Sequence, residues 1–162
     1  MKVRPAQPAD APAIAEITNQ IIRETLVTFT TDTRSAESIA QDIHARGPGF
    51  LVAEVDDHVV GFATFGPFRS GPGYAHSCEH SIQLARDARG KGAGRALMAA
   101  LEQAARAKGI HVLVAGISSA NSAAVAFHAA LGFEQVGHLP QVGYKWGQWL
   151  DLVLMQKILS PG

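Results

Sequence analysis

Three glycines alternate with cationic and small residues in one short segment, and together they have the make-up of a phosphate site. The segment reads Arg89, Gly90, Lys91, Gly92, Ala93, Gly94 and Arg95. Glycine leaves no side chain where a ligand must approach the backbone closely. The preceding residues, Ile82–Ala85, are typical of a strand end, and the run Arg95–Lys108 has the pattern of a helix. Because the first amides of a helix are unpaired and lie at the positive end of its dipole, this helix start is predicted to bind pyrophosphate.

The spacing of the glycines decides which kind of phosphate loop this is. A Walker loop would place serine or threonine after the lysine, whereas glycine follows Lys91. The dinucleotide fingerprint does not fit either, because neither possible register ends on a small residue. What remains is Arg-x-x-Gly-x-Gly, filled by Arg89, Gly92 and Gly94. A glycine-rich helix start can also be an ordinary tight turn, so the motif needs support from elsewhere in the chain.

Several helices are expected around this segment. Asp10 and Ser35 are candidate N-caps of two helices near the N-terminus, and the second of these is expected to end at Gly47. The third is the helix that follows the glycine segment. Asn121 or Ser122 caps a short fourth helix.

Apolar and β-branched runs predict the strands, and an antiparallel hairpin is expected around Asp56 and Asp57. Glu24–Thr33 reads as a loop or a short strand, and Gly66–Gly73 as an exposed loop. The expected strands are Lys2–Arg4, Phe50–Val55, His58–Phe65, a strand centred on Glu79–Leu84, Ile110–Ile117, Phe133–Gly137 and Trp149–Lys157. The order β-α-α-β-β-β-α-β-α-β-β predicts a single α/β domain over residues 1–162, with a mixed central sheet flanked by helices.

Composition narrows the class of protein. The chain has 162 residues, of which 47% are hydrophobic and 17% charged, and fourteen basic residues balance fourteen acidic ones. Because the chain has no net charge, no overall electrostatic field attracts nucleic acid or an anionic membrane, and any basic site must be local. The lone cysteine, Cys78, fits a reducing compartment, and no signal peptide or membrane span is expected. A cytoplasmic enzyme is therefore predicted.

In this order of elements, the segment Arg89–Gly94 resembles the pyrophosphate loop of the GCN5-related N-acetyltransferase (GNAT) family. A second stretch, Asn121–Phe133, is similar to the family's Asn-x-x-Ala segment with its later Gly-Phe, which lies beside the pantetheine arm of acetyl-coenzyme A. The two motifs imply a GNAT-type domain and acetyl-CoA as cosubstrate.

A finer resemblance links the chain to the phosphinothricin and methionine sulfoximine acetyltransferase branch. It is carried by Gly66–Arg69, Tyr74, Glu79–Ser81, Phe127–Phe133 and Pro140–Leu152. The resemblance implies transfer of an acetyl group to the α-amine of a glutamate-like or methionine-derived amino acid, by direct attack in a ternary complex. It also implies a homodimer with the site near the interface.

For the coenzyme, the backbone of the strand edge is expected to bind pantetheine and the glycine segment the pyrophosphate. Asn121 could hydrogen-bond the pantetheine arm, and a plain N-cap is the simpler interpretation of that residue. The expected coenzyme contacts are Ile82, Gln83, Leu84, Arg89, Gly90, Lys91, Gly92, Ala93, Gly94, Arg95 and Asn121.

For catalysis, an ammonium group must lose a proton before it can attack a thioester, so a base is needed. Glu79 is the candidate, since the branch carries its catalytic glutamate there; strand alternation also places Glu79, Ser81 and Gln83 on one face. His128 could protonate the leaving thiolate near neutral pH. The simpler alternatives are an exposed strand carboxylate and a packed helix histidine.

The substrate side is expected to include Phe29 and Tyr74 as walls and Arg69 as the partner of a carboxylate. Lys145 is expected to approach from a partner subunit. His76 replaces a bulky tryptophan of some branch members, which puts the side-chain preference in doubt. Each residue has a structural alternative, as a solvated loop charge or as core.

Other functions stay open at this point. A metal site is disfavoured, because His76 and His80 are too far apart on a strand to converge, and Cys78 points away from Glu79 and so is a poor acyl carrier. Another amine, such as a polyamine, an antibiotic or a protein N-terminus, could be the acceptor. A non-catalytic acyl-CoA sensor is the alternative outside enzymes.

Overall fold

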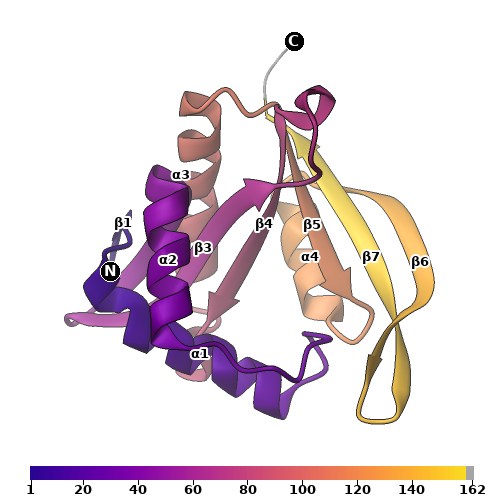
Figure 1. Cartoon of the computed structure of the whole chain (residues 1–162), viewed down its shortest axis with the longest axis horizontal. Coiled ribbons are helices and arrows are strands. Elements are labelled where there is room, and N and C mark those ends of the chain that lie inside the picture. The colour runs from indigo at the N-terminus through magenta and orange to yellow at the C-terminus, as the bar shows by residue number, and fades with distance from the viewer. Residues whose placement is uncertain (160–162) are drawn as a thin grey trace.

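A computed structural model describes residues 1–159, and in it seven strands form one sheet. The strands lie in the order β1-β2-β3-β4-β5-β7-β6 (Figure 1). The strands are β1 (Lys2–Pro5), β2 (Phe50–Val55), β3 (His58–Pro67), β4 (Ser77–Leu84), β5 (Val112–Ser118), β6 (Glu134–Lys145) and β7 (Gln148–Ile158). The α-helices are α1 (Ala11–Glu24), α2 (Ala36–Arg46), α3 (Ala93–Ala107) and α4 (Ser122–Ala130). This confirms the predicted order and the mixed α/β fold.

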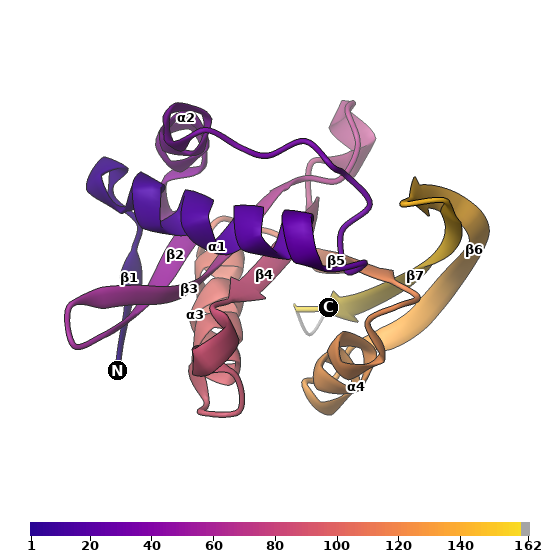
Figure 2. The same ribbon diagram turned by 90° about the horizontal axis from the view of Figure 1, so that it is seen from below.

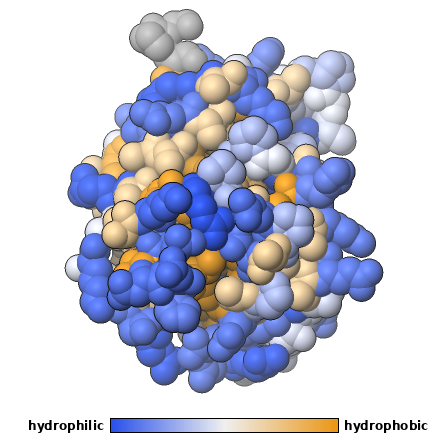
Figure 3. Space-filling view, turned by 90° about the vertical axis from the view of Figure 1, so that its left-hand side faces the viewer, coloured by the Kyte–Doolittle hydropathy of each residue, from blue (hydrophilic) through white to orange (hydrophobic). Residues whose placement is uncertain are grey.

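The helices cover both faces of the sheet. Figure 2 shows α1 and α2 on one face and α3 and α4 on the other. On the first face, Ile14, Ile17 and Ile21 of α1 recur at helical spacing and pack on Phe50 and Phe62 of the sheet. Polar side chains cover most of the surface on the side of the N-terminus, where hydrophobic side chains show mainly in the gaps between them (Figure 3).

A second hydrophobic core lies under α3, whose apolar stripe is fully buried. Leu97, Met98 and Leu101 pack against Leu51 and Leu113 of the sheet. The two cores hold β4 and β5 at the middle of the sheet from both sides. Within the part of the chain that the structure describes, no helix is long and apolar enough to cross a membrane.

Among residues 1–159, β4 and β5 form the only parallel strand pair, and their ladder is short. Residues 77–80 of β4 pair with residues 112–115 of β5, whereas β4 pairs with β3 on its other side as far as Leu84. Beyond His80 the two parallel strands therefore separate. The last four residues of β4 present their main chain to the gap without a partner from β5.

At α1 and α2 the helix ends lie where they were predicted, but of the two only α2 has a side-chain cap. The Ser35 hydroxyl accepts the Ser38 amide at 3.1 Å, and Gly47, with a positive φ of 50°, follows the end of α2. Asp10 occupies the N-cap position of α1, but its side chain makes no capping hydrogen bond. Its carboxylate forms a bidentate pair with Arg4, at 2.8 and 2.9 Å, because a guanidinium offers two aligned donors that a helix terminus does not.

Strand β6 is much longer than the predicted Phe133–Gly137. The sequence does not predict one continuous strand here, because Pro140 has no amide hydrogen for a regular ladder. Gln141 also interrupts the ladder, with a positive φ of 57°. The register shifts between Leu139 and Gly143, and the Gln141 amide donates to Asp151 of β7 at 2.8 Å. β6 tolerates this bulge because it is the edge strand of the sheet.

Candidate active site

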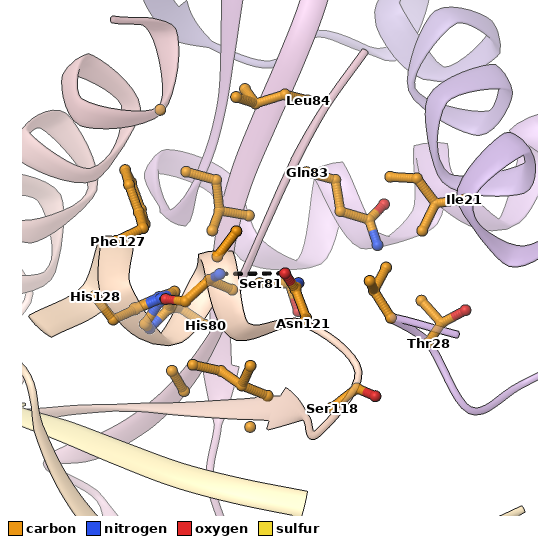
Figure 4. Close-up of a pocket in the computed structure, with 18 of the residues that line it drawn as sticks. Ile21, Thr28, His80, Ser81, Gln83, Leu84, Ser118, Asn121, Phe127 and His128 are labelled. Carbon is orange, nitrogen blue, oxygen red and sulfur yellow. Dashed lines mark hydrogen bonds between the residues drawn. The ribbon is translucent and has the colours of Figure 1, made fainter. Parts of the chain in front are cut away.

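A cavity of about 620 Å³ opens where β4 and β5 separate. Figure 4 shows the labelled side chains around it, with Phe127 and His128 on one side and Ile21 and Thr28 on the other. The lining comes from the α1 end and the loop after it, from β4 and β5, from the start of α3 and from α4. Its members are Ile21, Val27, Thr28, Phe29, Glu79, His80, Ser81, Ile82, Gln83, Leu84, Arg89, Gly90, Gly94, Ala115, Gly116, Ile117, Ser118, Asn121, Ala123, Ala124, Phe127, His128 and Leu152.

The helix start beside the cavity has the geometry of an anion site. α3 begins at Ala93, two residues earlier than predicted, because Gly92 takes a left-handed conformation with φ of 88° and ends the preceding turn. The first helical bond joins the Ala96 amide to the Gly92 carbonyl, so the earlier amides stay free for a ligand. Arg89 lines the cavity, and Lys91 is exposed nearby. A pyrophosphate group fits this set of donors.

Gly94 lines the cavity and also makes room for a side chain. A Cβ atom at Gly94 would lie 3.2 Å from the ring of Phe127. At Gly90 and Gly92, by contrast, a Cβ would meet nothing within 4 Å, and the positive φ is the reason for glycine. The contact between Gly94 and Phe127 joins the two sequence motifs across the cavity.

Asn121 is the N-cap of α4. Its side-chain oxygen accepts the Ala124 amide at 3.2 Å, which is the dashed bond in Figure 4. The residue also lines the cavity, so its expected contact with the coenzyme and its capping role are compatible.

Glu79 lies on β4, in the last part that still pairs with β5, and it lines the cavity. The residue is exposed as a whole, yet loss of solvent around the carboxylate raises its pKa. Gly116 makes room for it on β5, because a Cβ at that position would lie 3.0 Å from Oε2. A carboxylate with a raised pKa inside a cavity is suited to accept and release protons.

His80 and His128 form a buried pair below the cavity, with 3.0 Å between their Nε2 atoms. His128 Nδ1 lies 2.8 Å from the carbonyl oxygen of Ala124, which can only accept, so Nδ1 carries the hydrogen. In the neutral ring, His128 Nε2 then accepts the hydrogen from His80 Nε2. Burial lowers the pKa of His80 to about 3 and also lowers that of His128, so both rings are neutral at pH 7.

This pair bears on the expected role of His128 as an acid. The hydrogen on His128 Nδ1 is donated to the Ala124 carbonyl, and Nε2 accepts the hydrogen of His80. In this arrangement His128 has no free hydrogen for a leaving thiolate. The buried Nδ1 of His80 has no hydrogen-bond partner among residues 1–159. In this arrangement His80 and His128 are a packed, neutral imidazole pair, and the role of His128 as an acid stays a prediction.

Of the expected substrate residues other than Glu79, only Phe29 lines the cavity. Arg69 lies in the exposed loop after β3, 5.6 Å from the centre of the Phe68 ring, and Tyr74 packs edge-on against the same ring. Lys145 is buried among backbone carbonyls of its own chain, and burial lowers its pKa. Its Nζ is thus not placed to reach another subunit's site.

Three polar residues that line the cavity were not among the predicted site residues: Thr28, Ser81 and Ser118. Gln83, an expected coenzyme contact, also lines the cavity, and its side-chain oxygen is buried without a hydrogen-bond partner in residues 1–159. For Ser81, the alternation of β4 with Glu79 was the available signal. For Thr28 and Ser118 no local pattern exists, because the fold alone brings them together.

The described residues contain no group of three or more His, Cys, Asp or Glu side chains that could hold a metal ion. Cys78 is buried, and burial raises the pKa of its thiol. The cavity brings together a carboxylate with a raised pKa, a row of free backbone groups and a helix start suited to an anion. These features fit an acyltransferase that takes its acyl group from a phosphate-bearing carrier.

Comparison with known proteins identifies the family. Residues 15–133 match the Acetyltransferase (GNAT) family. The L-amino acid N-acyltransferase MnaT of Escherichia coli is 43% identical over 159 residues, covering 96% of this chain and 92% of the relative. An L-methionine sulfoximine/L-methionine sulfone acetyltransferase of Pseudomonas aeruginosa is 39% identical, covering 98% of this chain and 95% of the relative.

A phosphinothricin N-acetyltransferase of Streptomyces coelicolor is 33% identical, covering 98% of this chain and 96% of the relative. Among solved structures, the putative acetyltransferase yncA from Salmonella typhimurium with its cofactor acetyl-CoA superimposes with a TM-score of 0.96 at 39% identity. The alignment covers 100% of this chain and 95% of that one. The chain belongs to the acetyltransferase (GNAT) family and is an acetyl-CoA-dependent acyltransferase, as its motifs implied.

Proposed function

We propose that the protein transfers an acetyl group from acetyl-CoA to the α-amine of a small amino acid or analogue, with Glu79 as the base. The observation that carries this proposal is the position of Glu79, inside the cavity and on the strand that leads to the anion site of α3. The relatives named for methionine sulfoximine, methionine sulfone and phosphinothricin support an amino-acid acceptor.

Acetyl-CoA, when bound, supplies the acetyl group as an activated thioester. The amides at the start of α3 and Arg89 hold its pyrophosphate, and the free backbone of Ile82–Leu84 holds the pantetheine arm. Glu79 takes one proton from the substrate ammonium, and the free amine then attacks the thioester carbon in the ternary complex. The new N–C bond replaces the C–S bond, and the second proton that the nitrogen loses on forming the amide passes through water to the leaving thiolate.

The acceptor side of the cavity is largely apolar. Ile21, Val27, Phe29 and Leu152 form its walls, and Arg89 is the only cationic side chain among the lining residues within 1–159. An uncharged amino-acid side chain of moderate size suits such walls. A carboxylate on the substrate needs a cation, and the exposed loop with Arg69 is the proposed source.

The test is a thiol-release assay with acetyl-CoA and a panel of amines. We expect sustained release with methionine sulfone, methionine sulfoximine or phosphinothricin, and little with polyamines, aminoglycosides or a peptide N-terminus. Preference for one of the latter would replace the proposed substrate class. Coenzyme binding in calorimetry without release for any amine would identify an acyl-CoA sensor instead.

We further propose that the protein works as a homodimer in the cytoplasm. β6 is an edge strand, and aromatic side chains are exposed on β6, on β7 and in the turn between them: Tyr144, Trp146 and Trp149 are 56%, 50% and 64% exposed. The rings of Tyr144 and Trp149 pack together with centroids 4.8 Å apart. An exposed apolar edge of this kind is typical of a protein interface.

Light scattering after size-exclusion chromatography tests the dimer. We expect the wild type to elute as a dimer and Trp149→Glu as a monomer. Val55→Ser, at an exposed apolar residue on β2, is the matched control and leaves the mass unchanged. A wild type that is monomeric at high concentration would contradict the proposal.

A further inference from the structure

The loop after α1 forms the acceptor wall of the cavity without any regular structure. Residues 25–29 belong to no helix or strand, and Val27, Thr28 and Phe29 line the cavity. Figure 4 shows Thr28 on the side of the cavity opposite His128. Because this segment has no strand or helix hydrogen bonds, its buried carbonyls need donors from other parts of the chain. The side chain that supplies those donors also sets the shape of this wall.

Lys145, at the end of β6, supplies these donors. Its Nζ lies 2.8 Å from the Ile22 carbonyl oxygen and 2.7 Å from that of Thr25. It is also 3.0 Å from both the carbonyl and the hydroxyl oxygen of Thr28. The residue is only 1% exposed. One side chain therefore joins the last turn of α1 to the loop, where carbonyls otherwise lack partners.

Two further contacts hold the same loop against the sheet. The Ser118 hydroxyl of β5 donates to the Leu26 carbonyl at 2.7 Å. The ring of Phe29 lies on Gly143 of β6, where a Cβ atom would be only 2.6 Å from the ring. β6 thus contacts the loop at two positions, two residues apart on one face.

The hairpin turn after Lys145 also serves this contact. Trp146 has a positive φ of 51°, which is unusual for a bulky residue, and Gly147 follows with 76°. The turn places the Trp146 ring 4.6 Å from Nζ. A cation over an aromatic face is stabilised there, which offsets the backbone strain.

We propose that Lys145 is a positioning residue that sets the acceptor wall of the cavity through Thr28. Figure 4 shows the Thr28 oxygen turned away from His80, as its bond to Nζ requires. Without the Lys145 ammonium, its three hydrogens are lost to the Ile22 carbonyl at the end of α1 and to the Thr25 and Thr28 oxygens of the loop. The kinetic consequence rests on the proposed function: the amine KM depends on Lys145, and the acetyl-CoA KM does not.

The test is Lys145→Met, which keeps the apolar stem and removes the donors. We expect the amine KM to rise about tenfold, as the loss of buried hydrogen bonds predicts. The acetyl-CoA KM is expected to stay the same. Amide hydrogen exchange in residues 25–29 should become faster.

Lys157→Met is the matched control. Its Nζ also caps a helix end, donating to the Leu131 carbonyl at 2.7 Å and to Glu102 at 2.9 Å, far along the chain from the loop. This variant should lose thermal stability without a change in amine KM. An equal rise in amine KM in both variants would show general destabilisation and overturn the proposal.

Gly143→Ala keeps the proposal testable if Lys145→Met does not fold. One methyl group against Phe29 should shift the ring and raise the amine KM in the same selective way. Unchanged loop exchange in Lys145→Met, or unchanged amine KM in Gly143→Ala, would overturn it. If the wild type is inactive on amino acids, the proposed function is rejected. The positioning role of Lys145 can still be measured then, because hydrogen exchange needs no turnover.

Discussion

The two sides of the cavity are built in different ways. The coenzyme side comes from two continuous stretches, Ile82–Gly94 and Asn121–His128, each with a recognisable local motif. The acceptor side is assembled from the end of α1, the loop after it, β5 and a residue of β7. Most of the cavity-lining residues in the first side are among those that the sequence predicts, whereas Phe29 is the only such residue on the loop after α1. A phosphate site depends on local backbone geometry, whereas a pocket wall depends on which distant segments pack together.

The largest expected effect is at Glu79, which lies between the two sides of the cavity, and it should change catalysis without changing coenzyme binding. Glu79→Gln should lower kcat by about 100-fold or more, because the ammonium loses its base. Acetyl-CoA affinity, measured by calorimetry, should not change. In the wild type, kcat/KM should fall as pH drops through the raised pKa of Glu79, and this inflection should vanish in the variant.

Glu134→Gln, which changes an exposed carboxylate on β6, is the control and should leave kcat unchanged. Full turnover in Glu79→Gln would remove this residue from the mechanism. It would also move the chemistry away from the border between the two sides.

The next effect concerns the coenzyme side alone. Gly92→Ala places a Cβ at φ of 88°, which costs about 1–2 kcal/mol and is expected to displace the start of α3. The acetyl-CoA KM should rise about tenfold while the amine KM stays constant. Gly109→Ala, at φ of 79° beyond the other end of α3, has the same strain and should not affect acetyl-CoA. Equal effects of both would mean that strain, and not the anion site, is responsible.

A smaller effect concerns stability in acid. The pKa of His80 is about 3 in the folded protein and about 6.5 when unfolded, so the unfolded state binds the extra proton between these values. Stability is complete above pH 6.5 and is lost as pH falls toward 3. Thermal scans should show Tm falling by roughly 5 °C from pH 7 to 5. His80→Asn should reduce this loss, and an unaltered pH profile would contradict the neutral pair.

The smallest effect tests whether Asn121 belongs to the coenzyme side or only to its helix. Asn121→Ala and Ser35→Ala each remove an N-cap bond of similar length, 3.2 and 3.1 Å. Each should cost about 1 kcal/mol of stability in denaturant unfolding. If Asn121 also binds pantetheine, only its variant raises the acetyl-CoA KM. Equal KM values in both variants would leave Asn121 as a cap alone.

Sequence interpretation did not find the bonding partners of three polar side chains. Asp10 has the residue type of a cap, but Arg4 takes its carboxylate. His128 has the right position for an acid, but His80 uses its lone pair. Lys145 has the charge of a substrate residue, but carbonyls of its own chain enclose it. In each case the residue type was recognised and its bonding partner was not.

The sequence by itself determined the element order, the family motifs and the helix start that suits pyrophosphate, because these depend on periodicity and backbone conformation within a few residues. Only the tertiary structure decided where β4 and β5 separate and which side chains enclose the acceptor. It also decided that Lys145 bonds to Thr28 and that His128 pairs with His80. The physical reason is that buried polar groups must be paired, and their partners are chosen by packing between distant segments.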